Sequence, residues 1–315
     1  MEYKKRTLTK TLEKTIGERP LVYLNGPRQV GKSTLAGKIS SGKKHHYITF
    51  DAPLLLAAAK NDPANFVNTL PEDCLNIIDE VQMAPEIIPY LKIRIDERRK
   101  AGEKSALYLL TGSANLMALP ELAGALVGRM SILTLYPFSA SEVAQGKKNI
   151  IASFFEAEFR QKTGGDTFNL PDIIKRATYP ELAVESGIDK VRWLDDYLTT
   201  ILQRDVRTLA DIRNPEKIAM LLSVLSMRAG GLLNNAAVSS EIGLDAKTYE
   251  KYKSVAINTF LIFEVKPWST PHKLNKRFTK AVKLYFTDCN LLTYIMKRDL
   301  HDIRENDKMT FGRIL

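Results

Sequence analysis

A short glycine-rich segment with one lysine and two hydroxyl residues is the part of this chain best suited to chemistry. Its residues are Gly26, Pro27, Arg28, Gln29, Val30, Gly31, Lys32, Ser33 and Thr34. The pattern G-x-x-x-x-G-K-[ST] is typical of a loop that binds the phosphates of a nucleoside triphosphate. It follows the apolar run 21–24 and precedes a helical pattern, which is the context such a loop requires. A chance match in a glycine-rich turn is the alternative.

Each residue type in this loop has a definite part in phosphate binding. Gly26 and Gly31 allow the dihedral angles of a tight loop, so that successive N–H groups can point at phosphate oxygens. The helix that begins near Lys32 adds the positive end of its dipole. We expect the Lys32 ammonium group to reach the β- and γ-phosphates and the Ser33 hydroxyl to bind Mg²⁺. The sequence therefore predicts a site for ATP and Mg²⁺.

Two adjacent carboxylates follow another apolar run. Residues 75–78 read Leu-Asn-Ile-Ile and are followed by Asp79 and Glu80. At the carboxyl end of a strand beside the loop, Asp79 would hold Mg²⁺ directly or through a water molecule. Glu80, on the other side of the backbone, would polarise the water that attacks the γ-phosphate. An exposed acidic turn is the alternative. A water-activating Glu favours an ATPase over a small-molecule kinase.

Further polar residues lie where a sensor or a charge-neutralising group is expected. Thr111, Ser113 and Asn115 follow the apolar run 106–110, and ligands bind at the carboxyl ends of strands in open α/β sheets. Capping of a turn explains any one of them almost as well. Arg129 is a candidate for neutralising charge on the transferred phosphate, in this subunit or in a neighbouring one, and a structural salt bridge is the alternative. Arg204 is a weaker candidate.

The elements that must position these residues form an alternating series. Apolar runs at 21–24, 47–50, 75–78, 106–110 and 132–135 read as strands. Helical patterns at 7–17, 34–39, 54–59, 63–70 and 85–99 separate or precede them. This alternation predicts an α/β fold, a P-loop NTPase with a five-stranded parallel sheet and helices on both faces. We assign residues 1–143 to this core.

The pattern changes after the core. Residues 144–171 read as a connection and 172–212 as helical, so that 144–212 form a helical connecting or lid region. From 213 to 290 we expect a winged-helix domain. It consists of a helix after Asn214-Pro215, a short helix from Asn234 to Gly243, a third helix over 246–258 capped by Asp245, and a hairpin of 263–266 with 283–287. Residues 291–315 remain as a C-terminal segment.

Positive charge gathers in the hairpin of the expected winged helix. Between Glu264 and Asp288 there is no acidic residue, whereas the interval includes Lys273, Lys276, Arg277 and Lys280. These side chains are candidates for DNA contacts. A solvated basic surface and a protein-binding module are equally good interpretations, since a winged helix alone does not define its partner.

Composition limits the class of protein. The chain has 315 residues and a net charge of +10, with 44% hydrophobic and 26% charged residues, which is ordinary for a globular protein. The beginning of the chain lacks the apolar core of a signal peptide, and no apolar run is long enough to span a membrane. The two cysteines, Cys74 and Cys289, are isolated. We therefore expect a cytoplasmic protein without a disulfide framework or a zinc site.

Several motifs in combination make the chain resemble one family. Besides the loop, they are Ile77-Ile-Asp-Glu-Val-Gln82 with Pro85, Leu110-Thr-Gly-Ser113, Leu122-Ala-Gly with Gly128-Arg129, Leu135-Tyr-Pro-Phe-Ser139 with Glu142, Tyr179-Pro-Glu181, Gln203-Arg-Asp205, Pro267-Trp268 and Lys283-Leu-Tyr-Phe-Thr-Asp288. The chain resembles prokaryotic AAA-type ATPases that join a P-loop core to a winged-helix domain of unknown function. The resemblance implies ATP hydrolysis, with Lys32 and Ser33 at the phosphates and Mg²⁺, Asp79 at Mg²⁺, Glu80 catalytic and Ser113 a sensor.

Three positions depart from the pattern of that family. Asn290 stands where the family usually has glycine, and Ala177-Thr178 replace its usual glycines before Tyr179. Most members also continue into a restriction-endonuclease-like domain, so we interpret 291–315 as a shortened form of that continuation and expect no nuclease activity.

These observations together predict an ATPase. Its cycle would move the winged-helix domain, which would contact DNA or a protein, and the molecule would be a candidate homo-oligomer. A nucleotide-gated switch with little turnover is the alternative, and a small-molecule kinase is a third.

Overall fold

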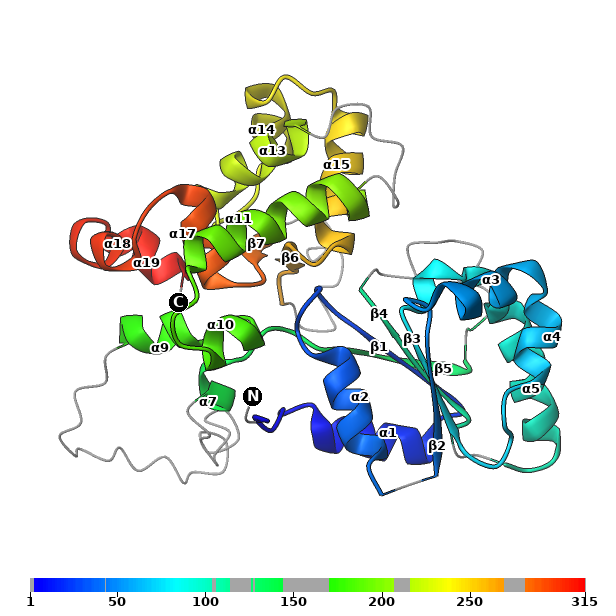
Figure 1. Ribbon diagram of the computed structural model, residues 1–315. Helices are drawn as coiled ribbons and strands as arrows, with labels where there is room; N and C mark the ends of the chain where they lie inside the picture. Colours follow the sequence, from blue (N-terminus) through cyan, green and yellow to red (C-terminus); the bar gives the residue numbers. More distant parts are fainter. Residues whose placement is uncertain are drawn as a thin grey trace.

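A central parallel sheet, in a computed structural model of the chain, carries the amino-terminal half of the molecule (Figure 1). The structure describes residues 3–42, 44–103, 106–113, 126, 128–143, 170–206, 216–268 and 281–314. The strands are β1 (Leu21–Asn25), β2 (His45–Thr49), β3 (Leu75–Asp79), β4 (Tyr108–Gly112) and β5 (Met130–Thr134). Their spatial order is β2-β3-β4-β1-β5, and all neighbouring pairs are parallel. The predicted five-stranded parallel sheet is confirmed.

Three strands begin two residues away from the position predicted. Strands β2 and β5 start earlier than the apolar runs indicated, and β4 starts later. The ladder decides these limits, because Leu21 of β1 pairs with Tyr108 on one side and with Met130 on the other. Apolar content does not show where pairing begins. Thr111 and Gly112, which follow the apolar run, thus belong to β4.

Helices cover both faces of the sheet. The face with α1 (Thr9–Glu18) and α2 (Lys32–Ser40) buries Val22 and Leu24 of β1. The opposite face buries Leu21 and Tyr23 beneath α3 (Pro53–Asn61), α4 (Pro63–Asn68) and α5 (Ile88–Lys100). Two short 3₁₀ helices, η1 (Val81–Met83) and η2 (Pro85–Ile87), connect β3 with α5. Side chains of a strand alternate between faces, so one apolar run serves both layers.

A series of short helices follows the sheet. These are α7 (Ala140–Val143), α9 (Leu170–Arg176), α10 (Pro180–Val184), α11 (Lys190–Thr200) and the π-helical turn η4 (Ile201–Asp205). The predicted helical stretch 172–212 is therefore divided. Pro180 occupies the first position of α10, and Gly187 has a positive φ of 94° in the turn before α11. Both residues interrupt a continuous helix for the usual backbone reasons.

Three helices and an antiparallel strand pair come next. They are α13 (Glu216–Ser226), α14 (Asn235–Glu241), α15 (Ala246–Asn258), β6 (Ile262–Val265) and β7 (Lys283–Phe286). The Asp245 side chain accepts a hydrogen bond from Thr248 N at 3.0 Å, as the predicted cap requires. Strands β6 and β7 pair from Ile262–Phe286 to Val265–Lys283. The predicted cap at Asn214-Pro215 lies outside the described residues.

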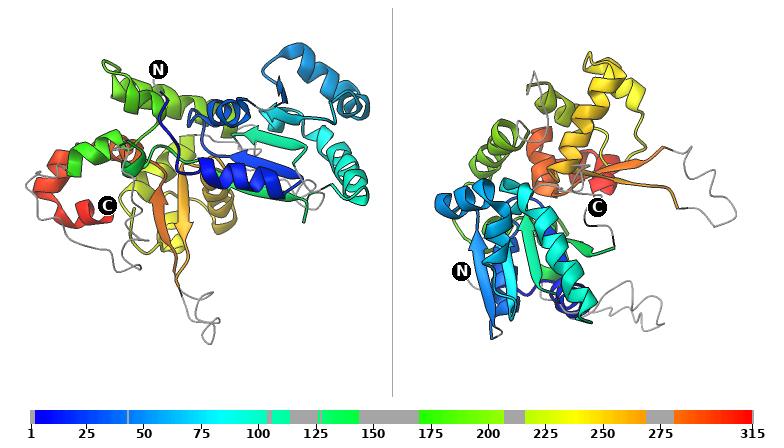
Figure 2. Two further views of the ribbon diagram at one scale, coloured as in Figure 1. Left: turned by 90° about the horizontal axis from the view of Figure 1, so that it is seen from below. Right: turned by 90° about the vertical axis from the view of Figure 1, so that its right-hand side faces the viewer.

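The chain ends with three more helices, α17 (Cys289–Met296), α18 (Leu300–Asn306) and α19 (Lys308–Ile314). The hydrophobic core is continuous between the two halves, because the α1–α2 side of the sheet and the carboxyl-terminal helices share one buried cluster. Both views of Figure 2 show the carboxyl-terminal elements against the sheet domain. Tyr136, just beyond β5, also contacts Phe263 of β6 with ring centroids 6.3 Å apart. The two halves are therefore packed together.

Candidate active site

The glycine-rich loop lies between β1 and α2, as predicted. Gly26 has φ 145°, and a Cβ atom added there would come within 2.1 Å of the carbonyl oxygen of Leu135. Gly31, at the start of α2, is left-handed with φ 89°. Gln29, between them, also has a positive φ of 60°. Glycine is required at both ends of the loop, by a steric contact at one end and by backbone conformation at the other.

The Lys32 ammonium group lies inside the loop. Its Nζ atom donates to the carbonyl oxygens of Gly26 at 3.1 Å and Pro27 at 2.7 Å, and the side chain is only 6% exposed. A cation held at the centre of a loop of left-handed and tight turns is suited to an anionic ligand. The role of Lys32 at the phosphates stays a prediction.

Asp79 is the meeting point of three hydroxyl groups. Ser33 Oγ and Tyr47 OH each donate to Asp79 Oδ2 at 2.7 Å, and Thr111 Oγ1 donates to Asp79 Oδ1. The carboxylate is 5% exposed. Hard oxygen ligands of this kind, a serine hydroxyl and one carboxylate, suit Mg²⁺ that also binds phosphates. The donor set therefore fits the metal ion that the sequence predicts.

Tyr47 was not foreseen as part of the site. Burial and, after it, the hydrogen bond to Asp79 raise the pKa of the Tyr47 hydroxyl well above its ordinary value. The phenol therefore stays protonated near neutral pH and remains a donor to the carboxylate. No motif marks a tyrosine in the middle of a second strand. Only the parallel pairing of β2 with β3, which sets Thr49 opposite Asp79, brings it close.

Glu80 follows Asp79 in a left-handed conformation with φ 56°. A non-glycine residue adopts this conformation rarely, and such residues gather at functional sites. Its Oε2 atom accepts a hydrogen bond from Gln82 Nε2 and lies 3.5 Å from Ser113 Oγ. Gln82 Nε2 also donates to Ser113 Oγ at 3.2 Å. The predicted base and sensor are thus neighbours, and Gln82 joins them.

A cleft opens between the loop and the helices α10 and α11. Its volume is about 480 Å³, and it is lined by Arg28, Gln29, Glu80, Glu181, Trp193, Asp196, Tyr197 and Thr200. A Cβ atom added to Gly31 would lie 3.9 Å from Pro180 Cγ, so α10 begins directly beside the loop. Trp193 stacks on Tyr197 and donates through Nε1 to Glu181 Oε2 at 3.0 Å. The helical region therefore forms one wall of the cleft.

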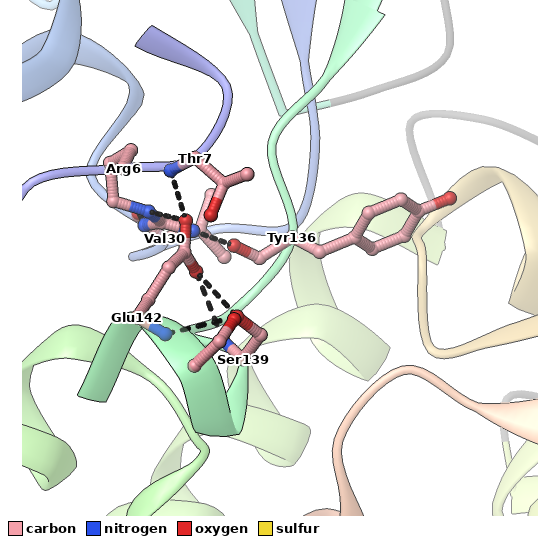
Figure 3. A network of polar contacts seen from close by, with 7 residues as sticks. Arg6, Thr7, Val30, Tyr136, Ser139 and Glu142 are labelled. Atoms are coloured by element: carbon pink, nitrogen blue, oxygen red, sulfur yellow. Dashed lines mark hydrogen bonds and ion pairs between the residues drawn. The ribbon is translucent and has the colours of Figure 1, made fainter. Parts of the chain in front are cut away.

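A buried arginine, Arg6, forms a hydrogen bond with the backbone of the glycine-rich loop (Figure 3). Arg6 donates to the carbonyl oxygens of Val30 (2.9 Å) and Tyr136, and its Nε atom lies 3.1 Å from Glu142 Oε1. Burial lowers the pKa of the guanidinium, an effect that the Glu142 carboxylate opposes. Glu142 also accepts from the backbone N–H of Ser139 at 3.0 Å. The Arg6–Glu142 ion pair therefore connects the beginning of the chain with the loop and with the segment that follows β5.

Some predicted residues lie elsewhere. Arg129 precedes β5 and lies at the amino-terminal ends of the strands, because Met130 pairs with Leu21 at the start of β1. The glycine-rich loop lies at the opposite, carboxyl-terminal ends. It forms a bidentate ion pair with Asp96, at 2.6 and 3.0 Å, which lowers the pKa of that carboxyl. Arg204 is exposed on η4. Asn115, Lys273, Lys276, Arg277 and Lys280 lie outside the described residues.

Comparisons with known proteins agree with this geometry. Residues 18–144 match the family model of an AAA domain. A Walker-type ATPase of Pyrococcus abyssi superposes with a TM-score of 0.52 over 91% of this chain and 94% of that one, at 14% identity, which is a likeness of fold. The α/β P-loop NTPase fold that the sequence predicted is confirmed.

The remainder of the chain is less defined by its relatives. Residues 167–302 match a domain of unknown function, a range that crosses the predicted boundary at 213. Uncharacterized proteins of Mycobacterium bovis and Mycobacterium tuberculosis are each 27% identical over 305 residues. These residues are 95% of this chain but 61% of each relative, so the chain spans less than two thirds of their length. The winged helix and the predicted domain boundaries stay predictions.

The described residues include neither a membrane-spanning helix nor a cluster of metal ligands. Among them, no helix has both the length and the apolar composition needed to cross a membrane. Nor do three or more His, Cys, Asp or Glu side chains gather in this part of the chain in a way that would hold a metal ion.

Proposed function

We propose that this protein binds ATP with Mg²⁺ and hydrolyses it to ADP and phosphate. The observation that carries the proposal is the convergence of Ser33, Asp79 and Glu80 beside a glycine-rich loop that encloses a buried lysine. They come from two parts of the chain, the start of α2 and the carboxyl end of β3, and each has a side chain suited to one component of phosphoryl transfer.

Each residue of the site would have a separate role in ATP hydrolysis. Lys32 exchanges the carbonyl oxygens of Gly26 and Pro27 for phosphate oxygens, since an anion is the stronger acceptor for an ammonium group. Ser33 and Asp79 hold Mg²⁺, which supplies charge neutralisation at the phosphates. Glu80 accepts the proton of the attacking water, and Ser113 with Gln82 orients the Glu80 carboxylate.

We also propose that the ATP cycle moves the carboxyl-terminal region against the P-loop domain. Helices α10 and α11 form a wall of the cleft, and the contact of Tyr136 with Phe263 joins β5 to the β6–β7 pair. The three helices and the strand pair of residues 216–286 would act as a winged helix that binds DNA or a protein, with Lys273, Lys276, Arg277 and Lys280 as the candidate DNA contacts.

Steady-state phosphate release, measured with and without duplex DNA, tests this function. We expect turnover in the wild-type protein and none in Lys32→Ala, because the ammonium group is the main charge facing the triphosphate. Unchanged nucleotide affinity in Lys32→Ala would contradict the site. For DNA, the dependence of binding on salt should weaken when Lys273, Lys276 and Arg277 are neutralised. An unaltered slope would make the basic segment a solvated surface.

A nucleotide-gated switch with little turnover is the second candidate. One observation favours it: Gln82 and Ser113 already hold the Glu80 carboxylate that would have to reach water. Tight ATP binding without phosphate release, whether or not DNA is present, would select the switch over the ATPase.

A further inference from the structure

A second hollow lies on another face of α11. It is formed by α9, α11, α17 and the turn before α18, and has a volume of about 620 Å³. Helix α11 contributes Lys190, Val191 and Leu194 to this hollow. Other residues of the same helix line the cleft beside the glycine-rich loop: Trp193, Asp196, Tyr197 and Thr200. The volume lies within the range of small-molecule sites, about 300–1,000 Å³. This hollow is separate from the glycine-rich loop, which contributes no residue to it.

The lining combines an apolar surface with excess positive charge. Ile174, Val191, Leu194 and Leu300 supply aliphatic side chains. The ionised groups are Lys175, Lys190, Lys297 and Arg298, opposed within the lining by Asp299 alone. An apolar pocket with a few polar groups at defined positions is the usual form of a ligand site.

Two of the four cations form no ion pair with a carboxylate of the described residues. Lys175 pairs with Asp299 at 3.4 Å, and Arg298 pairs with Asp302 and Asp307. Lys190 donates only to the carbonyl oxygen of Lys175, at 3.2 Å. Within the described part of the chain, neither Lys190 nor Lys297 forms an ion pair.

Carboxylates outside the lining offset part of its positive charge: Asp302 and Asp307 pair with Arg298, Asp195 accepts from Tyr294, and Asp288 attracts Lys190. Asp288 is the N-cap of α17, but it is only 3% exposed and so cannot be reached by a ligand. Burial raises its pKa to about 6, so it offsets the charge of Lys190 only in part near that pH. Lys190 and Lys297 are therefore the two basic side chains of the lining with which no described carboxylate forms an ion pair.

We propose that this pocket binds a small amphipathic anion, a carboxylate on an alkyl body. The carboxylate lies at Lys190 and Lys297, where it gains charge-assisted hydrogen bonds. The alkyl body lies against Ile174, Leu194 and Leu300, where apolar surface leaves water. A cation is disfavoured by the excess of basic groups, and a fully polar anion would leave the apolar wall wet. The inference is independent of the proposed ATPase function.

Calorimetric titration of the nucleotide-free chain with octanoate tests the proposal, and octan-1-ol serves as the neutral match. We expect octanoate to bind roughly tenfold tighter than octan-1-ol, as one charge-assisted contact would provide. The combined change Lys190→Ala with Lys297→Asn should remove that difference. Lys247→Ala, at an exposed lysine of α15 outside the pocket, should retain it.

A matched pair at the rim separates charge from folding. Val191 is 65% exposed and lies in the first turn of α11, where an acidic residue favours the helix. Val191→Asp should weaken octanoate binding more than Val191→Asn, while octan-1-ol binds equally to both. The proposal is overturned if octanoate binds no tighter than octan-1-ol, if the Asp and Asn variants bind octanoate alike, or if Lys247→Ala loses the preference as well.

Discussion

Asp79 collects donors from three different elements, and this is what distinguishes it at the scale of single residues. Ser33 comes from α2, Tyr47 from β2 and Thr111 from β4. A carboxylate that accepts several hydrogen bonds is held in one orientation, which a metal ligand needs. Glu80, the next residue, points to Gln82 and Ser113 instead. Two adjacent carboxylates thus have separate surroundings, which fits separate roles.

Replacing Glu80 with Gln tests the role of the second carboxylate. The amide keeps the size of the side chain but cannot accept a proton from water, so turnover should fall by about 10² to 10⁴. ATP affinity should stay near the wild-type value, because Glu80 does not belong to the loop. Phosphate release and ATP binding by the same preparation measure both. Wild-type turnover in Glu80→Gln would remove Glu80 from this role.

Replacing Tyr47 with Phe tests the hydroxyl that the sequence did not predict. The change removes one donor to Asp79 Oδ2 and leaves Ser33 in place, so the Mg²⁺ concentration at half-maximal turnover should rise roughly tenfold. ATP affinity without Mg²⁺ should not change. Tyr90→Phe on α5, outside this hydrogen-bond network, is the control. Identical Mg²⁺ dependence in both variants would show that Tyr47 has no part in the metal site.

The strand–loop–helix unit from β1 to α2 is the decisive feature at the scale of elements. The conformation of this unit depends on residues that are close together in the chain. The sequence could therefore predict that the loop lies between a strand and a helix. Tyr47, Gln82 and Arg6 were not predicted, because their contacts depend on strand order and on segments as far apart as Arg6 and Glu142. The strand limits also depended on register rather than on apolar content.

Two glycines in this unit should respond oppositely to the same substitution. Gly26→Ala puts a methyl group 2.1 Å from the Leu135 carbonyl oxygen, so we expect a loss of about 1–3 kcal/mol in unfolding free energy and weaker ATP binding. Gly37→Ala, on α2 with nothing within 4 Å, should gain about 0.5–1 kcal/mol. Urea denaturation of both variants measures this. Equal effects would mean that the loop tolerates a side chain at Gly26.

The cap of α17 makes stability depend on pH. Asp288 accepts from Leu291 N at 2.7 Å, and burial raises its pKa from 3.8 to about 6. The folded state thus prefers the protonated carboxyl, and its contribution is complete below pH 4 and lost as pH rises through about 6. The loss should amount to roughly 2–3 kcal/mol.

Urea denaturation between pH 4 and 7.5 measures this contribution. In Asp288→Asn, which can still cap the helix, the decline should disappear. The control is Asp245→Asn at the cap of α15. There, hydrogen bonds of Thr248 lower the carboxyl pKa, so this carboxylate stabilises the fold more as pH rises. A wild-type profile that rises over the Asp288 interval would contradict the assignment.

The role of Arg129 depends on the arrangement of the whole molecule. It lies at the amino-terminal ends of the strands, away from the loop of its own chain, so we propose that it acts on the nucleotide of a neighbouring subunit. The continuous core between sheet and carboxyl-terminal helices makes each chain one packed body that could present this end of the sheet to another copy. The sequence left open which subunit Arg129 serves, since only the fold shows at which end of the sheet it lies.

Mixing two inactive variants tests this arrangement. Lys32→Ala lacks phosphate binding but keeps Arg129, whereas Arg129→Ala keeps the loop. If Arg129 acts across a subunit boundary, the mixture should regain part of the wild-type phosphate release at protein concentrations that permit assembly. Lys100→Ala, at the exposed end of α5, is the control for the surface. Full turnover in Arg129→Ala alone would show that Arg129 has a structural role, such as its ion pair with Asp96, and no role in turnover.

The aromatic wall beside the loop gives the protein an optical signal of its own. The chain has two tryptophans: Trp193 faces the cleft, and Trp268 is 84% exposed. A Trp268→Phe variant would therefore emit from the cleft alone. Its emission should shift or quench when a nucleotide enters, so occupancy could be followed in real time without any label.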